Sequence, residues 1–245
     1  MTDYPNIDLP PTEAKIFHRM WTELAQLGQL PHGYGILCPL CLIPKSHEEL
    51  TLEHIIPQRA LRHDPESLRR AHSLNDRSGL TLLCRSCNGL KGKCYDPIIE
   101  KMFKTPKFAP QPHEQKRELK ARRTLAYLAA FRELGYQYIL TSRLDPVRQD
   151  FLVPLSSPAN TGLYFISIGF NRDDPHAYFD GWCDTFDEKG DQTNSVFTCY
   201  SDPTSETIQI RIRHITVMLP KSDRGIVLAR KPGTPPNTSV NLSVT

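Results

Sequence analysis

The sequence lacks any run of 18 or more apolar residues, so it offers no candidate for a membrane-spanning helix. Its first residues, Met-Thr-Asp-Tyr-Pro, lack the basic and apolar regions of a signal peptide. No internal repeat is visible. We therefore expect a soluble, cytoplasmic protein that does not contact a membrane.

The chain also lacks an even number of cysteines, since it has seven. Four of the seven cysteines form two Cys-x-x-Cys pairs, which leaves Cys94, Cys183 and Cys199 as an odd remainder. Such a remainder argues against the disulfide framework of a small secreted protein, and a reducing compartment fits better.

A strong excess of one charge is also absent, since 30 Lys and Arg residues face 27 Asp and Glu residues, for a net charge of +3. That balance is compatible with a nucleic-acid partner without demonstrating one. The distribution is more informative, because basic residues outnumber acidic ones between residues 59 and 93. The basic residues there are Arg59, Arg62, Arg69, Arg70, Arg77, Arg85, Lys91 and Lys93.

The length of 245 residues allows one large domain or two modest ones, and we prefer two. Five segments are expected, which differ in composition and hydrophobic pattern. They are an N-terminal helix (1–32), a cysteine-containing module (33–100), a linker with a basic amphipathic helix (101–135), a strand-rich domain (136–230) and a disordered tail (231–245).

Helical spacing of apolar residues from Ile16 to Leu27 predicts an amphipathic helix with Thr12 as its N-cap and Gly28 beyond its end. Short strands are expected at residues 34–42 and 51–56, and a short helix at residues 65–71. The second cysteine pair is expected to open another helix, with Asn88 and Lys91 on adjacent turns.

Three prolines in residues 103–112 predict a linker, and residues 114–134 predict a long helix with an apolar stripe. Basic side chains crowd the first half of that helix. Such a helix can lie along a phosphate backbone or face solvent, and solvation is the interpretation that we prefer.

From Tyr136 onward the pattern predicts short strands separated by turns. Strict alternation from Ile208 to Arg213 predicts isoleucines facing a core, with Arg211 and Arg213 facing water or a ligand such as phosphate. The expected strands are 136–140, 151–155, 163–170, 177–186, 196–200, 208–219 and 225–230.

The two cysteine pairs are Cys38-x-x-Cys41 and Cys84-x-x-Cys87. Each pair places two sulfurs on one tight turn, and two such pairs can close a tetrahedron around Zn²⁺. We therefore expect a structural zinc ion whose loss unfolds the module.

Polar residues between and after the pairs can support hydrolysis. Glu53 and His54 stand in the segment Leu-Glu-His-Ile-Ile-Pro, and Asn88 follows Cys87 directly. A carboxylate and an amide oxygen are hard ligands suited to Mg²⁺ or Mn²⁺. A histidine with a pKa of about 6.5 can take a proton from water at neutral pH.

These segments together resemble the four-cysteine HNH endonucleases of the ββα-metal fold, over residues 34–94, about a quarter of the chain. The resemblance implies two antiparallel strands and a helix stapled by zinc. It also implies that His54 is the general base and that Glu53 and Asn88 bind the catalytic cation. DNA would be cut to 5′-phosphate and 3′-hydroxyl ends.

Two positions depart from that family. Its members more often have Asp where this chain has Glu53. They also have a middle Asn, which braces the loop bearing the histidine, where this chain has Gly79. Asn75, four residues earlier, is the candidate substitute, and we include it in the expected site.

The sequence thus predicts an α+β protein with a zinc-stapled nuclease module, flanking helices and a strand-rich C-terminal domain. DNA is the expected partner, in restriction or antiphage defence, and residues 136–230 are expected to read DNA, bind a protein partner or form a homodimer. A zinc-knuckle module that binds nucleic acid without cutting it is the alternative. The residues expected to contact nucleic acid are Lys91, Arg85, Arg59, Arg211 and Arg213.

Overall fold

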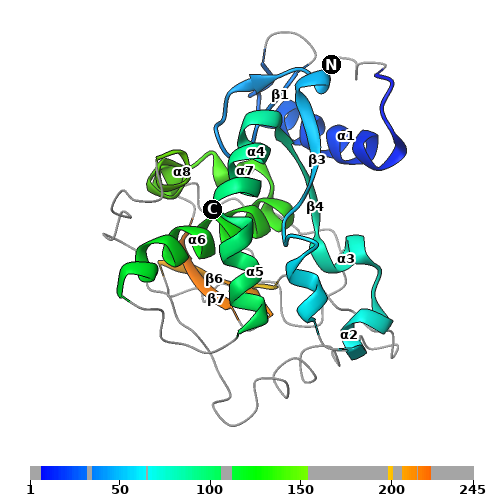
Figure 1. The fold of residues 1–245 in the computed structure, drawn as a ribbon. Helices are drawn as coiled ribbons and strands as arrows, with labels where there is room; N and C mark the ends of the chain where they lie inside the picture. The colour runs from blue at the N-terminus through cyan, green and yellow to red at the C-terminus, as the bar shows by residue number, and fades with distance from the viewer. Residues whose placement is uncertain are drawn as a thin grey trace.

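The computed structural model describes residues 7–31, 35–64, 66–105, 112–153, 198–200, 206–213 and 215–221. The strands expected at 163–170, 177–186 and 225–230 lie outside these residues, as do Cys183 and the tail at 231–245. The described chain combines helices with small antiparallel sheets, so the fold is broadly α+β, as predicted (Figure 1). Within the described residues, no helix has both the length and the apolar character needed to span a membrane.

The predicted N-terminal helix is confirmed as α1 (Pro11–Gln26), which buries Phe17, Met20, Trp21 and Leu24. Thr12 is not its N-cap, because the helix begins at Pro11 and its N-cap is Pro10, two residues earlier than predicted. Proline suits the first helical turn, where its missing N–H would have no intrahelical partner.

Two small antiparallel hairpins follow α1. In the first, β1 (Ile36–Leu37) pairs with β2 (Pro44–Lys45) across the turn that carries Cys38 and Cys41. In the second, β3 (Leu50–His54) pairs with β4 (Leu80–Cys84), which leads directly into α4 (Arg85–Cys94). η1 (His47–Glu49) lies between β2 and β3. The elements between β3 and β4 are η2 (Ala60–His63), α2 (Glu66–Ala71) and α3 (Leu74–Ser78).

The centre of the described fold is a long helix, α6 (Pro112–Leu134), which contacts α5 (Asp96–Lys104). We did not predict α5. We predicted that the basic half of α6 faces solvent. This prediction is wrong for Lys120, Arg122 and Arg123, whose side chains are buried. Arg123 donates to Asp150 across 2.7 Å, and Glu118 accepts from Arg122. Ion pairing therefore allows a basic helix to lie in the interior.

Residues 136–139 and 142–152 are helical, so the strands predicted at 136–140 and 151–155 are wrong over the described residues. The Tyr136-Gln-Tyr138 alternation resembled a strand, but Glu23 of α1 accepts the Tyr136 backbone N–H at 3.0 Å and holds the start of a helical turn. The helices are α7 (Tyr136–Ile139), η3 (Ser142–Leu144) and α8 (Asp145–Leu152).

Three C-terminal strands form one antiparallel sheet against α6 (Figure 1). The buried isoleucines at 208, 210 and 212 confirm the predicted core face. The single strand predicted at 208–219 is instead a hairpin, because the chain turns at Arg213, which has φ of 55°. The strands are β5 (Thr198–Tyr200), β6 (Thr207–Ile212) and β7 (Ile215–Pro220).

Arg213, which we predicted to face water or a ligand, instead points into the protein. Its side chain is buried and donates to the Asp64 carboxylate, from Nε at 3.0 Å and from a terminal nitrogen at 3.2 Å. Asp64 also accepts from Arg77 at 3.0 Å. Arg213 therefore joins the C-terminal hairpin to the segment between β3 and β4. We made the same prediction for Arg211, but the structure does not describe the side chain of that residue.

Replacing Arg213 by methionine is expected to lower the free energy of unfolding by about 1.5–3 kcal/mol, the usual loss for hydrogen bonds to a charged group. Urea denaturation measures this change. Arg143→Met is the control, because Arg143 forms an exposed pair with Glu206 and its loss should change stability by about 0.5 kcal/mol or less. Equal effects of the two substitutions would contradict a structural role for Arg213.

Candidate functional site

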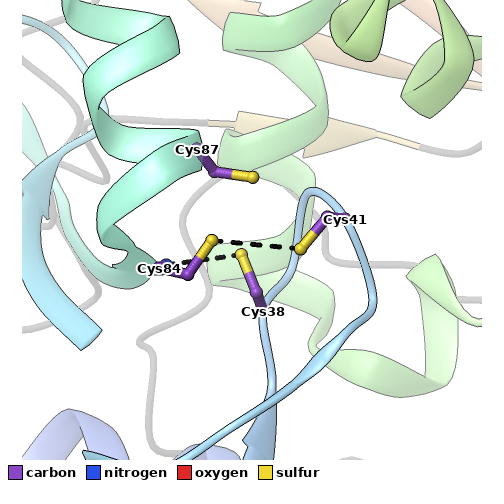
Figure 2. Close-up of side chains that lie close together, drawn as sticks. All are labelled: Cys38, Cys41, Cys84 and Cys87. Carbon is purple, nitrogen blue, oxygen red and sulfur yellow. Dashed lines mark hydrogen bonds between the residues drawn. The ribbon is translucent and has the colours of Figure 1, made fainter. Parts of the chain in front are cut away.

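The four paired cysteines gather at one point, as predicted. Their sulfur atoms all lie within 4.8 Å of one another, and the Cys41 and Cys84 sulfurs are 3.9 Å apart. Figure 2 shows Cys38 and Cys41 on the β1–β2 turn and Cys84 and Cys87 at the start of α4, with the sulfurs directed toward a common centre. The turn and the helix start, far apart in sequence, are thereby side by side.

The donor set fits zinc. A tetrahedral ion with Zn–S bonds of about 2.3 Å requires sulfurs about 3.8 Å apart, close to the spacing present. The Cys84 backbone N–H donates to the Cys38 sulfur at 3.4 Å, so the start of α4 is hydrogen-bonded to the cysteine turn. These features identify a candidate structural metal centre.

Hydrogen bonds between the sulfurs couple the protonation of three of the cysteines. A hydrogen bond between the two sulfurs raises the pKa of Cys38 and lowers the pKa of Cys41. Hydrogen bonding to Cys38 and Cys41 raises the pKa of Cys87. Four thiolates this close would repel one another, and a bound dication removes that repulsion.

The metal centre is braced from the interior. Tyr127 of α6 donates its hydroxyl to the Pro39 carbonyl at 2.7 Å, inside the cysteine turn. Tyr136 of α7 donates its hydroxyl to the Leu37 carbonyl at the end of β1. The orientation of the cysteine turn therefore depends on the central helices as well as on the metal.

One face of β3 meets α4 through two polar pairs. Asn88 donates from its amide to the Thr51 hydroxyl at 2.8 Å, and the Lys91 ammonium donates to Glu53 at 2.5 Å. Thr51 and Glu53 share this face because side chains alternate along a strand. The structure thus brings Glu53 and Asn88 onto facing elements, each with a protein partner.

Lys91, which we expected at the surface near phosphate, is instead buried and paired with carboxylates of the protein. It is 0% exposed, and its ammonium also donates to Asp96 at 2.7 Å and to the His54 carbonyl at 3.2 Å. Three acceptors therefore hold this charge in the interior. The aliphatic stem crosses from α4 to β3, which fixes the distance between them.

The predicted catalytic cation does not fit these residues as they are arranged. Glu53 is 7% exposed, and its carboxylate is in contact with the Lys91 ammonium. A divalent ion on the same carboxylate would lie against a buried positive charge that it repels. Carboxylate and amide oxygens are chemically suitable for Mg²⁺ or Mn²⁺, but Lys91 would first have to leave Glu53.

His54 ends β3 half-buried, with amide groups beside its ring. Gln58 donates from Nε2 to His54 Nε2 at 2.9 Å, and the Asn75 side chain also hydrogen-bonds the ring. Burial lowers the pKa of His54, the Asn75 hydrogen bond opposes that shift, and the Lys91 charge adds to it. The ring is therefore neutral at pH 7, which is the form that can accept a proton.

Asn75 reaches His54 through the short helix α3. Ser73 caps α3, and Gly79 ends it with φ of 63°, a conformation that glycine adopts readily. The Ile55 N–H donates to the Gly79 carbonyl at 2.9 Å, which places α3 against the end of β3. This arrangement of α3 brings Asn75 to His54. A side-chain amide therefore contacts the histidine although residue 79, where an Asn was expected, is glycine.

Arg59 and Arg85, which are also expected to bind nucleic acid, are exposed. Arg59 follows Gln58 at the surface, and Arg85 lies at the start of α4, where it donates to the Glu48 carbonyl at 2.9 Å. Both side chains lie on segments adjoining the site.

Sequence analysis missed three residues that hold the site together: Thr51, Gln58 and Asp96. Gln58 stands four residues after His54, and Asp96 five residues after Lys91, so their spacing offered a weak local signal. Thr51 could have been found from the strand, because it shares the face of Glu53.

No family model matches the chain, and no curated protein or solved structure matches it either.

Proposed function

We propose that the chain is a zinc-stapled HNH-type endonuclease that hydrolyses phosphodiester bonds of DNA, with His54 as the general base. One observation carries this proposal: a half-buried histidine, held by Gln58 and Asn75, ends a strand that packs on the helix opened by the cysteine pair. The succession of β3, β4 and α4 supports the ββα-metal part of the proposal.

In the proposed reaction, the unprotonated ring nitrogen of His54 takes a proton from water. The water oxygen then attacks phosphorus, the bond to the 3′ oxygen breaks, and that oxygen takes a proton from solvent. The products are a 5′-phosphate and a 3′-hydroxyl. Gln58 is exposed, so its amide can turn away and free Nε2 for this water.

Phosphodiester hydrolysis also needs positive charge near the phosphate, because the negative phosphate repels the nucleophile. Arg59 and Arg85 are exposed and available for phosphate contact. Binding of Mg²⁺ or Mn²⁺ by Glu53 and Asn88 stays a prediction that requires Lys91 to move. A role in restriction or antiphage defence, and a partner or second copy bound through residues 136–230, also stay predictions.

A nucleic-acid-binding module without catalysis is the second candidate. The observation that favours it is the internal pairing of Glu53 with Lys91 and of Asn88 with Thr51. Both candidates keep the metal centre, and they differ in what His54 does.

Replacing His54 by alanine is expected to reduce cleavage about 10²- to 10⁴-fold, the usual contribution of a general base. Conversion of supercoiled plasmid by zinc-loaded protein, with Mg²⁺ or Mn²⁺ present, measures this loss. His47→Ala is the control, because His47 lies in η1, before β3. Cleavage that survives in the His54 variant at the wild-type rate would rule out His54 as the base.

A further inference from the structure

A groove of about 460 Å³ lies between α1 and the corner where α3 meets β4. Thr12, Lys15 and Arg19 of α1 form one wall, and Asn75 and Asp76 of α3 line the other. Leu80 and Arg132 also line the groove. Its volume lies within the range of about 300–1,000 Å³ typical of ligand sites. α1 and β4 are in contact, and α3 precedes β4 (Figure 1).

The groove adjoins His54. Asn75 lines it and also hydrogen-bonds the His54 ring. Leu80, another lining residue, is the strand partner of His54 in the β3–β4 pair. A ligand that fills the groove would therefore lie next to the proposed base.

The lining is positively charged. Lys15, Arg19 and Arg132 contribute three cations, and Asp76 contributes one carboxylate. Arg19 also pairs with Glu23 at 3.8 Å and Arg132 with Glu133 at 3.5 Å, which leaves Lys15 as the main source of positive charge. The Ser73 hydroxyl donates to that carboxylate at 2.6 Å, so Asp76 is engaged by the cap of its own helix. Arg19 donates to the Arg132 carbonyl at 3.3 Å, which holds its guanidinium group near the end of α6. Lys15 is exposed.

We infer that this groove binds the phosphate backbone of the nucleic acid. The bound phosphates would adjoin the phosphodiester that faces His54. The inference rests on the proposed function for the identity of the ligand. Lysine, arginine, hydroxyl and amide groups are the side chains that usually contact phosphate and sugar, and such contacts set the position of the strand without reading its sequence.

The test is the salt dependence of oligonucleotide binding by the full zinc-loaded chain, in the His54→Ala background so that no strand is cut. Lys15→Gln removes one cation without disturbing a packed side chain. The expected result is weaker binding, with a slope of log affinity against log salt that falls by about 0.9 for duplex DNA or about 0.7 for single strands. Lys104→Gln, on exposed α5 surface outside the groove, should leave the slope unchanged.

The outcomes separate this inference from the proposed function. An unchanged slope in Lys15→Gln, together with plasmid cleavage by the wild type, would overturn the groove and keep the nuclease. A reduced slope without wild-type cleavage would support the groove and overturn the nuclease. Absence of both binding and cleavage would overturn both.

Discussion

Removal of zinc with a chelator is expected to unfold the segment that the four cysteines join, between β1 and the end of α4. A structural zinc site contributes about 10–16 kcal/mol of apparent folding free energy. That is comparable to the total stability of an ordinary domain, about 5–15 kcal/mol. The β1–β2 turn and the start of α4 are brought together around the sulfurs, so losing the ion leaves repelling thiolates or unligated thiols there.

Hydrogen exchange of the full chain, with and without chelator, measures this change segment by segment. Peptides from residues 36–56 and 80–94 should lose protection. Cys84→Ser should reproduce the loss, and Cys94→Ser should retain about one zinc per chain, because Cys94 is outside the cluster. Unchanged protection after verified removal of metal would show that the cysteine cluster does not depend on zinc.

Replacing Lys91 by methionine is expected to lower the free energy of unfolding by about 3–5 kcal/mol, the usual effect of removing one partner from a buried ion pair. The substitution keeps the length of the stem but leaves Glu53 and Asp96 without the ammonium between them. Two carboxylates facing an apolar side chain then form a site of negative charge. A divalent cation is expected to restore much of the lost stability.

Thermal denaturation with increasing Mn²⁺, at saturating zinc, tests this expectation. Mn²⁺ should raise the melting temperature of Lys91→Met and have little effect on the wild type, in which the ammonium competes for Glu53. Lys93→Met is the control, because Lys93 is exposed on the same helix. Equal stabilisation of wild type and Lys91→Met would contradict competition between Lys91 and the cation.

Local spacing was enough to predict part of the site. Two Cys-x-x-Cys turns place sulfurs in pairs regardless of the rest of the fold, and the structure confirms that the four cysteines converge. The helix that follows Cys84 was predicted for the same reason, since a helix begins readily at a metal-binding turn. The amphipathic spacing of α1 was also sufficient, because one apolar face packs on the core.

The role of Lys91 could not be predicted, because its partner Glu53 is 38 residues away and the pair exists only once β3 packs on α4. A lysine is usually exposed, so sequence reasoning assigned it to the surface. The predicted orientation of Arg213 toward water or a ligand was wrong for the same reason, since its partner Asp64 is 149 residues away. Long-range ion pairs leave no trace in local spacing.

The C-terminal half shows where pattern and tertiary packing disagree. Alternating aromatic residues at 136–138 suggested a strand. The hydrogen bond that the Tyr136 N–H donates to the Glu23 carboxylate, and the burial of Tyr136, Tyr138 and Ile139, favour one helical turn instead. Alternation did predict the core face of Ile208, Ile210 and Ile212, because one side of that sheet packs on α6. The turn at Arg213 was missed because no glycine marks it.

The most direct test of the central claim is the chemistry of the ends left by the protein. Supercoiled plasmid is incubated with zinc-loaded wild type and His54→Ala in Mg²⁺ or Mn²⁺, and the products are treated with DNA ligase. The account predicts nicks or breaks that ligase seals, because they carry 5′-phosphate and 3′-hydroxyl groups, and their loss in the variant. Binding of DNA by both proteins with cleavage by neither would contradict it and identify a binding module.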